Sequence, residues 1–245
     1  LDNYTIKSIT GYREQEEILN STYTGEAYTS LYDAARNSVR ETFQQEFRLS
    51  SDLDGPLNYV VGAAYYTDDV DFNVFGRFGF LPLASAAAIF DDILQIQATE
   101  QERESYAFYV DGTYEITEST RLSLGYRHTR DEKEFHRLDI GGAGGNPLSN
   151  FLFDLSQITG PFDNPLPESA FALNARRSAE FSANTYRIVV DHDFRDDVMV
   201  YASFATGFVA GGFAETCGIY GGCKPFNSEE NDSFEVGLKA DLMDG

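Results

Sequence analysis

The sequence predicts an all-β protein, in the form of an antiparallel transmembrane β-barrel with long extracellular loops. Three observations favour this fold class. Apolar and polar residues alternate with a period of two, tight turns alternate with long connections, and no stretch reaches the roughly 18 apolar residues typical of a transmembrane helix. Outer-membrane barrels have short periplasmic turns and long extracellular loops. A soluble all-β fold is the alternative that the same alternation leaves open.

The alternation is clearest between residues 105 and 116, where Tyr106, Phe108 and Val110 share one parity and Ser105 and Asp111 share the other. The stretches 121–127, 185–194 and 233–242 repeat the pattern. Successive side chains of a strand point to opposite faces, so each stretch has one apolar and one polar face. We expect the apolar face to contact lipid, with Tyr and Phe forming the interfacial girdles because the chain has no Trp.

Eight strands follow from these stretches and from the turn residues between them. Tight turns are expected at 52–56, 117–120, 195–197 and 243–245, and long connections at 20–38, 71–100, 141–178 and 214–228. A strand crosses the bilayer with about 9–11 tilted residues, and the strands expected here are as long or longer. Their approximate ranges are 3–19, 39–52, 58–70, 101–117, 120–139, 179–194, 198–213 and 229–243.

Two of the long connections also contain apolar residues at helical spacing. Leu83–Ala98 opens with an alanine-rich run, and we expect a short amphipathic helix there. Phe151–Ile158 is a second candidate for a helical turn. The expected role of both segments is packing onto the mouth of the barrel.

Composition and charge exclude two classes of protein. The 245 residues include 40 acidic and 18 basic side chains, so the formal net charge is −22. A field of that sign and strength repels nucleic acid, and we expect no nucleic-acid partner. The 15 Tyr and 20 Phe residues are far too many for a disordered acidic segment.

The two cysteines, Cys217 and Cys223, are separated by five residues, of which three are glycine. A redox-active pair usually has two intervening residues, and a zinc site would need two further ligands. The spacing therefore predicts a small loop closed by a disulfide, which in turn indicates an oxidising compartment.

Several segments resemble strands of TonB-dependent outer-membrane receptors. The most specific is Tyr201–Phe213 (YASFATGFVAGGF), which leads after a loop to Phe234–Lys239 (FEVGLK). The opening Tyr4–Arg13 (YTIKSITGYR) and Glu46–Ser51 (EFRLSS), which precedes a turn at 54–57, are similar to other strands of the family. The resemblance extends over nearly every expected strand but over none of the long loops.

The resemblance implies a 22-stranded barrel around an N-terminal plug that carries a TonB-interacting box. We expect residues 1–245 to be part of that barrel wall, with the plug and the remaining strands outside this chain. It further implies the outer membrane of a Gram-negative bacterium and the import of a scarce nutrient such as a ferric siderophore, energised through the TonB complex. The alternative is a small self-closed eight-stranded barrel that serves as an anchor or adhesin.

No catalytic constellation gathers in the sequence, and we expect no enzymatic activity. His128 and His136 flank Asp131, Glu132 and Glu134, a combination that suits a metal or pH-sensing site. A solvated hairpin explains the same residues equally simply. An outer-membrane hydrolase is therefore the weakest of the functions considered.

Acidic residues gather where five strands are expected to leave the membrane on the long-loop side, at 14–17, 68–71, 100–104, 131–134 and 229–232. Carboxylates suit Ca²⁺ and Mg²⁺, so we hypothesise that this rim shares divalent cations with the phosphates of lipopolysaccharide. Solubilisation of the strand extensions is the simpler explanation. The weak metal candidates are Asp68, Asp69, Asp71, Asp131, Glu132 and Glu134.

Aromatic and basic residues of the long connections are generic candidates for contact with a transported ligand. No motif selects among them, so the sequence leaves the substrate-binding residues unassigned. These generic candidates are Tyr23, Tyr28, Tyr32, Arg36, Arg77, Arg176, Arg177 and Tyr220.

Overall fold

The computed structural model describes residues 3–22, 32–78, 93–139, 173–214, 217 and 223–241. Every regular element in these residues is a β-strand, which confirms the all-β prediction, and no helix in them is long and apolar enough to cross a membrane. The strands are β1 (Tyr4–Thr22), β2 (Tyr32–Ser51), β3 (Leu57–Phe78), β4 (Ile93–Thr117), β5 (Thr120–Asp139), β6 (Leu173–Arg195), β7 (Val198–Val209) and β8 (Glu229–Ala240).

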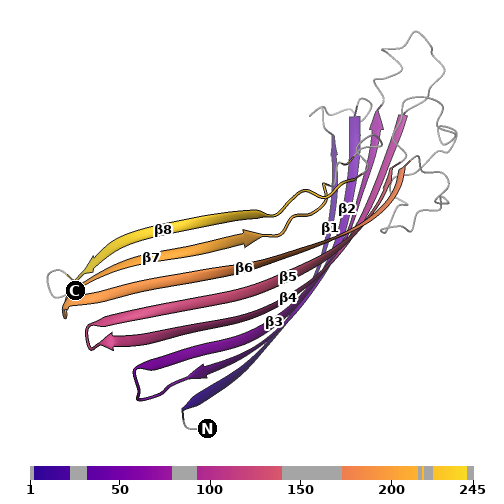
Figure 1. The fold of residues 1–245 in the computed structure, drawn as a ribbon. Coiled ribbons are helices and arrows are strands. Elements are labelled where there is room, and N and C mark those ends of the chain that lie inside the picture. Colours follow the sequence, from indigo (N-terminus) through magenta and orange to yellow (C-terminus); the bar gives the residue numbers. More distant parts are fainter. Residues whose placement is uncertain are drawn as a thin grey trace.

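The eight strands form one antiparallel sheet in which each strand pairs with the next along the chain (Figure 1). Tight turns join β2 to β3, β4 to β5 and β6 to β7, and all three lie at the same end of the strands. The first residue of β1 and the last residue of β8 lie at that end as well, because Tyr4 pairs with Ser51 and Ala240 with Val198. Within the described residues β1 pairs only with β2 and β8 only with β7, so this sheet is open.

Several strands are longer than the alternation predicts. Residues 32–38, 71–78, 93–100 and 173–178, expected in long connections, continue the ladder instead. The helix expected over Leu83–Ala98 is wrong for residues 93–98, which pair with β3, and its earlier part lies outside the described residues, as does Phe151–Ile158. Backbone pairing with β3, and from Gln97 also with β5, outweighs local helical spacing here. In contrast, β7 ends at 209 and β8 at 240, each earlier than expected.

The register divides the side chains between two faces. One face, which we call the outer face, contains the row Phe47, Ala63, Phe108 and His128, because these residues lie directly opposite one another on β2 to β5. The next row on the opposite, inner face contains Arg48, Gly62, Tyr109 and Arg127. Apolar and polar side chains that alternate along each strand therefore lie on opposite faces across β2 to β5, as the sequence predicts.

Large apolar side chains of the outer face are exposed. Val236 retains 85% of its accessible surface and Phe234 retains 78%. Apolar area left in contact with water costs about 25 cal/mol per Å², and patches this extensive mark contact with a membrane or a partner. Rows of aromatic residues bound this region, with Tyr59 and Tyr114 toward the tight turns and Tyr65 and Tyr106 toward the long connections.

A single sheet offers little core, and the buried apolar cluster lies on its inner face. Phe135, Ala175, Phe213 and Cys223 form this cluster, and each is at most 6% exposed. Two of its members come from the connection between β7 and β8, so this connection folds back over β5 and β6. Toward the tight turns, the ring of Tyr109 lies so close over Gly62 that a Cβ there would collide with it.

Candidate functional site

The inner face carries most of the basic side chains that the structure describes. In a closed barrel this face lines the lumen, where it meets whatever passes through. By register these bases are Lys7, Arg13, Arg36, Arg40, Arg48, Arg103, Arg121, Arg127, Lys133, Arg137, Arg177, Arg187 and Lys239.

In the half of the inner face near the tight turns, exposed ion pairs form within one strand and between strands. Arg48 Nη2 lies 2.8 Å from Glu46 Oε1, and the Tyr109 hydroxyl donates to the same carboxylate. Arg187 Nη1 donates to Asp111 Oδ2 at 3.1 Å. Pairs this exposed contribute about 0–1 kcal/mol each, so their main effect is to fix the orientation of the side chains.

In the half near the long connections, three acidic side chains of the inner face are buried against arginines, namely Asp68, Asp131 and Asp139. The first two make the closest contacts. Arg40 donates from Nε to Asp68 Oδ1 at 2.6 Å and from Nη2 to Oδ2 at 2.8 Å. Arg103 donates from Nε and Nη2 to Asp131 Oδ1 at 3.0 and 2.8 Å. Asp68 is 5% exposed and Asp131 is 2% exposed. Both carboxylates are thus neutralised by inner-face bases, which leaves the guanidinium groups as the accessible part of each pair.

The described part of the β7–β8 connection, residues 210–214, 217 and 223–228, forms a strap against this wall. Figure 1 shows it extending from β7 and β8, the two shortest strands, toward the end of the sheet where the longer strands reach the long connections. Lys133 Nζ donates to the Gly211 carbonyl at 2.6 Å. The ring of Phe213 stacks on Phe135 with centroids 5.0 Å apart. Burial, followed by the neighbouring charge of Arg103, lowers the pKa of the Lys133 ammonium.

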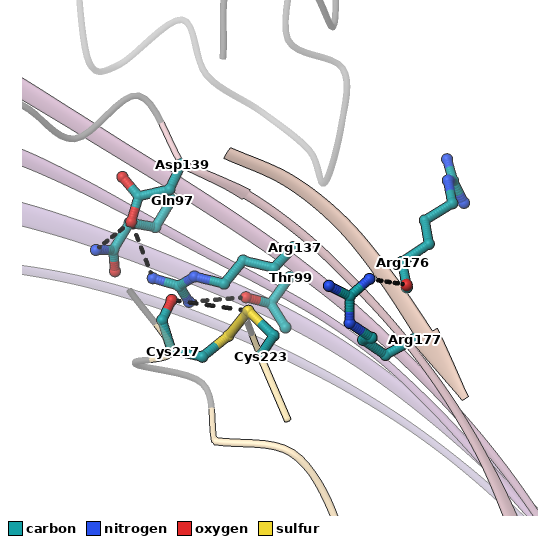
Figure 2. The surroundings of a disulfide bond; sticks show 8 residues. All are labelled: Gln97, Thr99, Arg137, Asp139, Arg176, Arg177, Cys217 and Cys223. Atoms are coloured by element: carbon teal, nitrogen blue, oxygen red, sulfur yellow. Dashed lines mark hydrogen bonds and ion pairs between the residues drawn. A yellow bond between two sulfur atoms is a disulfide. The ribbon is translucent and has the colours of Figure 1, made fainter. Parts of the chain in front are cut away.

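The strap is closed by the predicted disulfide between Cys217 and Cys223, whose surroundings are drawn in Figure 2. Arg137 lies beside it and is 2% exposed. Its guanidinium donates to Thr99 Oγ1 at 3.4 Å and to Asp139 Oδ2 at 3.1 Å, while its Nε has no acceptor among the described residues. A buried donor without an acceptor costs free energy, so Arg137 Nε reduces the stability that this side chain contributes to the wall beneath the strap.

The outer face becomes acidic on the side of the long connections. Its central row, Glu14, Glu41, Asp69, Glu102 and Glu134, places five carboxylates directly opposite one another on successive strands. Like charges in this position destabilise a sheet. With the carboxylates of the adjacent rows this row forms what we call the acidic band, whose other members are Glu16, Asp71, Glu100, Glu104, Glu132 and Glu180.

Titration of the acidic band is shifted accordingly. Burial, and then the charges of Glu100 and Asp69, raise the pKa of Asp71 to about 6. Burial, followed by neighbouring carboxylates, also raises the pKa of Asp69 and of Glu102. A proton is therefore held more readily here than at an isolated carboxylate.

The structure separates the six weak metal candidates onto two faces. Asp68 and Asp131 lie on the inner face, where each accepts hydrogen bonds from an arginine, whereas Asp69, Asp71, Glu132 and Glu134 belong to the acidic band. Across the part of the chain that the structure describes, no three His, Cys, Asp or Glu side chains gather closely enough to hold a metal ion. Ca²⁺ or Mg²⁺ at the rim stays a prediction.

The two histidines singled out in the sequence both lie on the outer face. His136 is 5% exposed, with Nδ1 at 3.3 Å from Glu100 Oε2 and Nε2 at 3.1 Å from Asn174 Oδ1. His128 is exposed, and its Nδ1 lies 2.9 Å from Asn184 Oδ1. They lie eight residues apart on one strand and share no partner in these contacts, so the described geometry does not join them into one site.

The generic ligand candidates are also divided. Arg36 and Arg177 lie on the inner face and Arg176 on the outer face. Tyr23, Tyr28 and Tyr220 lie outside the described residues, and the side chains of Tyr32 and Arg77 lie in strands but are not described.

Sequence reasoning missed the residues that hold the strap. Lys133 and Gly211 are 78 positions apart, and nothing local joins them. One signal was present in the sequence, because Phe135 has the parity of the polar face. An aromatic residue at that parity indicates that something packs against it from the inside.

Comparisons with known proteins agree on the fold. The family model described as TonB dependent receptor-like, beta-barrel matches residues 1–245. The ferric yersiniabactin uptake receptor FyuA from Yersinia pestis superposes with a TM-score of 0.74 at 14% identity, covering 99% of this chain. The ferric-catecholate import receptor Fiu from E. coli K12, in its closed form, gives a TM-score of 0.55 at 13% identity, covering 100% of this chain. A comparison with curated proteins gave no match.

The chain spans only about a third of these two structures, 32% of the first and 37% of the second. At such low identity the likeness establishes the fold of the sheet and nothing finer. The open edges at β1 and β8 are consistent with a wall segment of a larger barrel, since both edges would be paired in a closed one.

Proposed function

Because this chain belongs to the TonB-dependent receptor β-barrel family, we propose that it forms part of the wall of a receptor that imports a scarce nutrient across the outer membrane. Members of the family are outer-membrane proteins of Gram-negative bacteria. The structural neighbours are named as receptors for ferric yersiniabactin and ferric catecholates, and none is named as an enzyme. A ferric siderophore is therefore the ligand class we propose, with energy supplied through the TonB complex.

One observation carries the ligand class furthest, namely the concentration of bases on the inner face. Near the long connections, Asp68 and Asp131 are buried beneath their arginines, while Arg13 and Arg177 are exposed. An anionic iron chelate entering from that side would meet guanidinium groups, which bind carboxylate and catecholate oxygens through paired hydrogen bonds. The acidic band, which would repel such a ligand, lies on the opposite face of the same strands.

The described sheet gives no support to the alternative of a small self-closed barrel that acts as an anchor or adhesin. Closure with eight strands would require β1 to pair with β8, and within the described residues each has only one neighbour. The inner face also has polar rows of the kind that line a lumen rather than a packed apolar interior.

The proposal is tested by iron uptake. A strain that lacks its own ferric-siderophore receptors is given the receptor carrying this chain and is supplied with single ferric chelates, anionic or neutral. We expect growth on at least one anionic chelate and its loss when tonB is deleted. Growth on none of the chelates, or growth that does not require tonB, would contradict the proposal.

Two adjacent arginines provide a matched pair for the inner-face argument. Arg177→Gln removes a base from the inner face, and Arg176→Gln removes one from the outer face one residue earlier. We expect the first change to weaken binding of the transported anionic chelate by about tenfold, or ~1.4 kcal/mol, and the second to leave the affinity unchanged. Equal effects of the two changes would show that the inner face does not select the ligand.

A further inference from the structure

Where the strap meets the inner face, one base lacks a carboxylate partner. The register places Asp68, Arg103 and Lys133 directly opposite one another on β3, β4 and β5. Asp68 is paired with Arg40, and Arg103 is paired with Asp131. Lys133 makes no ion pair with any residue that the structure describes, so the surplus positive charge of this group lies on its ammonium.

The strap supplies Lys133 with an acceptor but not with a negative charge. Its Nζ donates to the Gly211 carbonyl at 2.6 Å and lies 5.8 Å from the centre of the Phe181 ring. Lys133 is half-buried, and an ammonium group partly removed from water is stabilised more by an anionic oxygen, which adds Coulombic attraction to the hydrogen bond. The Gly211 carbonyl is therefore a weaker partner than an oxyanion in the same place.

Arg103 provides a second donor beside this ammonium. Its Nε and Nη2 both donate to Asp131, whereas its Nη1 makes no hydrogen bond with a described residue. Its guanidinium lies 5.4 Å from the centre of the Tyr66 ring, which orients it, and 31% of the Arg103 side chain is exposed. Residues directly opposite on neighbouring strands have Cβ atoms about 5 Å apart, so one oxyanion with two oxygens can contact both Lys133 and Arg103.

The strap has internal bonds that do not depend on the wall. Gly212 and Phe226 exchange backbone hydrogen bonds of 2.8 and 3.3 Å, and the disulfide joins Cys217 to Cys223 further along. Release of the strap from the wall leaves these bonds intact. It breaks the hydrogen bond from Lys133 and the contact between the Phe213 ring and β5. The strap can therefore leave the wall as a unit while the sheet stays folded.

Release also removes a cost of the docked state. Arg137 lies directly opposite Ala175, which packs with Cys223 of the strap. The Nε of Arg137 is buried without an acceptor among the described residues. Water that enters when the strap leaves can accept a hydrogen bond from this nitrogen. The free energy that holds the strap in place is reduced by this amount.

We propose that Lys133 and Arg103 form a binding site for an oxyanion, and that the strap closes this site. In the closed state the Gly211 carbonyl occupies the Lys133 ammonium. A carboxylate or phosphate group, free or as part of an iron chelate, replaces that carbonyl, places a second oxygen on Arg103 and releases the strap. The inference deepens the proposed function and rests on it in one respect, namely that the inner face is the face that an anionic ligand meets.

The test measures amide hydrogen exchange in residues 211–213 of the complete receptor in mild detergent. The probes are sodium phosphate, citrate and ferric citrate, each compared with sodium chloride at the same ionic strength. We expect an oxyanion to make this exchange about tenfold faster, without a change in residues 106–110. A response to all three oxyanions assigns the site to free anions as well as chelates, whereas a response to ferric citrate alone assigns it to the chelate.

Three variants separate the site from its surroundings. Lys133→Met should abolish the response to the oxyanion. Lys224→Met is the matched control, because it removes an exposed lysine of the strap itself, and it should keep the response. Gly211→Ala places a methyl group against the Phe226 carbonyl and the Phe181 ring, so the strap can no longer dock. Because strap and anion compete for Lys133, calorimetry should show about tenfold tighter binding of the active oxyanion to Gly211→Ala. Heat-modifiable electrophoretic mobility verifies that each variant is folded.

Equal exchange in all four salts, or slower exchange in the oxyanions, would overturn the inference. A response that survives in Lys133→Met, or that is lost in Lys224→Met, would overturn Lys133 as the binding group. Unchanged affinity in Gly211→Ala would show that the strap does not close the site. Iron uptake that requires tonB without any exchange response would refute this inference and leave the proposed function standing, and an exchange response without uptake would do the reverse.

Discussion

The pH dependence of the acidic band can be predicted from Asp71. Its pKa rises from an ordinary 3.8 to about 6 in the folded sheet, so the folded state binds this proton more tightly than the unfolded state does. The contribution of Asp71 to stability is then greatest below about pH 4 and is lost as the pH rises toward 6, because the folded carboxylate must ionise beside Glu100 and Asp69. Above pH 6 the full cost is present.

The size of the effect follows from the shift. A difference of about two pKa units corresponds to about 3 kcal/mol as an upper limit. Asp71 is only partly buried, so solvent screening reduces the expected value to about 1–2 kcal/mol. Asp71→Asn removes the ionisation, and we expect it to raise the free energy of unfolding by that amount at pH 8 and to leave it unchanged at pH 4.

The assay is urea unfolding of the receptor in lipid vesicles at both pH values, followed by tyrosine fluorescence and by heat-modifiable mobility. Asp54→Asn, in the exposed turn between β2 and β3, provides a control with the same chemistry and no carboxylate row around it. A variant at Asp71 that is equally or less stable than the parent at pH 8 would refute the reasoning. So would a gain of the same size at both pH values, because a titration effect must vanish below the unfolded pKa.

Three further changes act on the inner face. Asp131→Ala leaves the half-buried Arg103 without its partner, and we expect a loss of about 2–3 kcal/mol in urea unfolding, whereas a loss below ~0.5 kcal/mol would show that the pair is no stronger than a surface one. Lys133→Met removes the donor to the Gly211 carbonyl, and amide hydrogen exchange in residues 211–213 should become about tenfold faster without a change in residues 106–110. Cys217→Ser opens the disulfide loop, and we expect about 2 kcal/mol less stability of the strap, measured by the same exchange and matched by dithiothreitol on the unaltered receptor.

The alternation of residues correctly predicted the part of the sheet that has an apolar outer face. Tyr106, Phe108 and Val110 share a face as expected, and tight turns lie at 52–56, 117–120 and 195–197 as expected. The turn expected at 243–245 lies outside the described residues. Periodicity works there because one face contacts an apolar environment and the other does not. The family resemblance adds what periodicity cannot supply, which is the larger barrel to which these strands belong.

The strand extensions could not be predicted in the same way. From Glu100 to Glu104 every position is polar, so the two faces differ in the sign of their charge and not in hydrophobicity. Glu100, Glu102 and Glu104 face outward while Gln101 and Arg103 face inward. Hydrophobicity does not distinguish the two faces of this segment, and only its pairing with β3 and β5 identifies it as a strand. A pattern of charge with period two would have revealed it.

The same reasoning explains why the acidic rim divides into two groups. Asp68 and Asp69 are adjacent in sequence but point to opposite faces, and so do Asp131 and Glu132. A cluster that looks continuous along the chain is therefore two surfaces, one neutralised by inner-face arginines and one left almost without bases.

This division indicates where part of the net charge of −22 lies, namely on the outer face of the strand extensions. If the excess acid served only to solubilise the strand extensions, it would be spread over both faces, since both leave the membrane together. Instead the inner face balances its buried acids with arginine, and the outer face sets five carboxylates directly opposite one another. Repulsion along that row costs stability unless cations or protons reduce it. We predict that divalent cations at the outer face reduce this repulsion, so that removing them with EDTA lowers the stability of these strands.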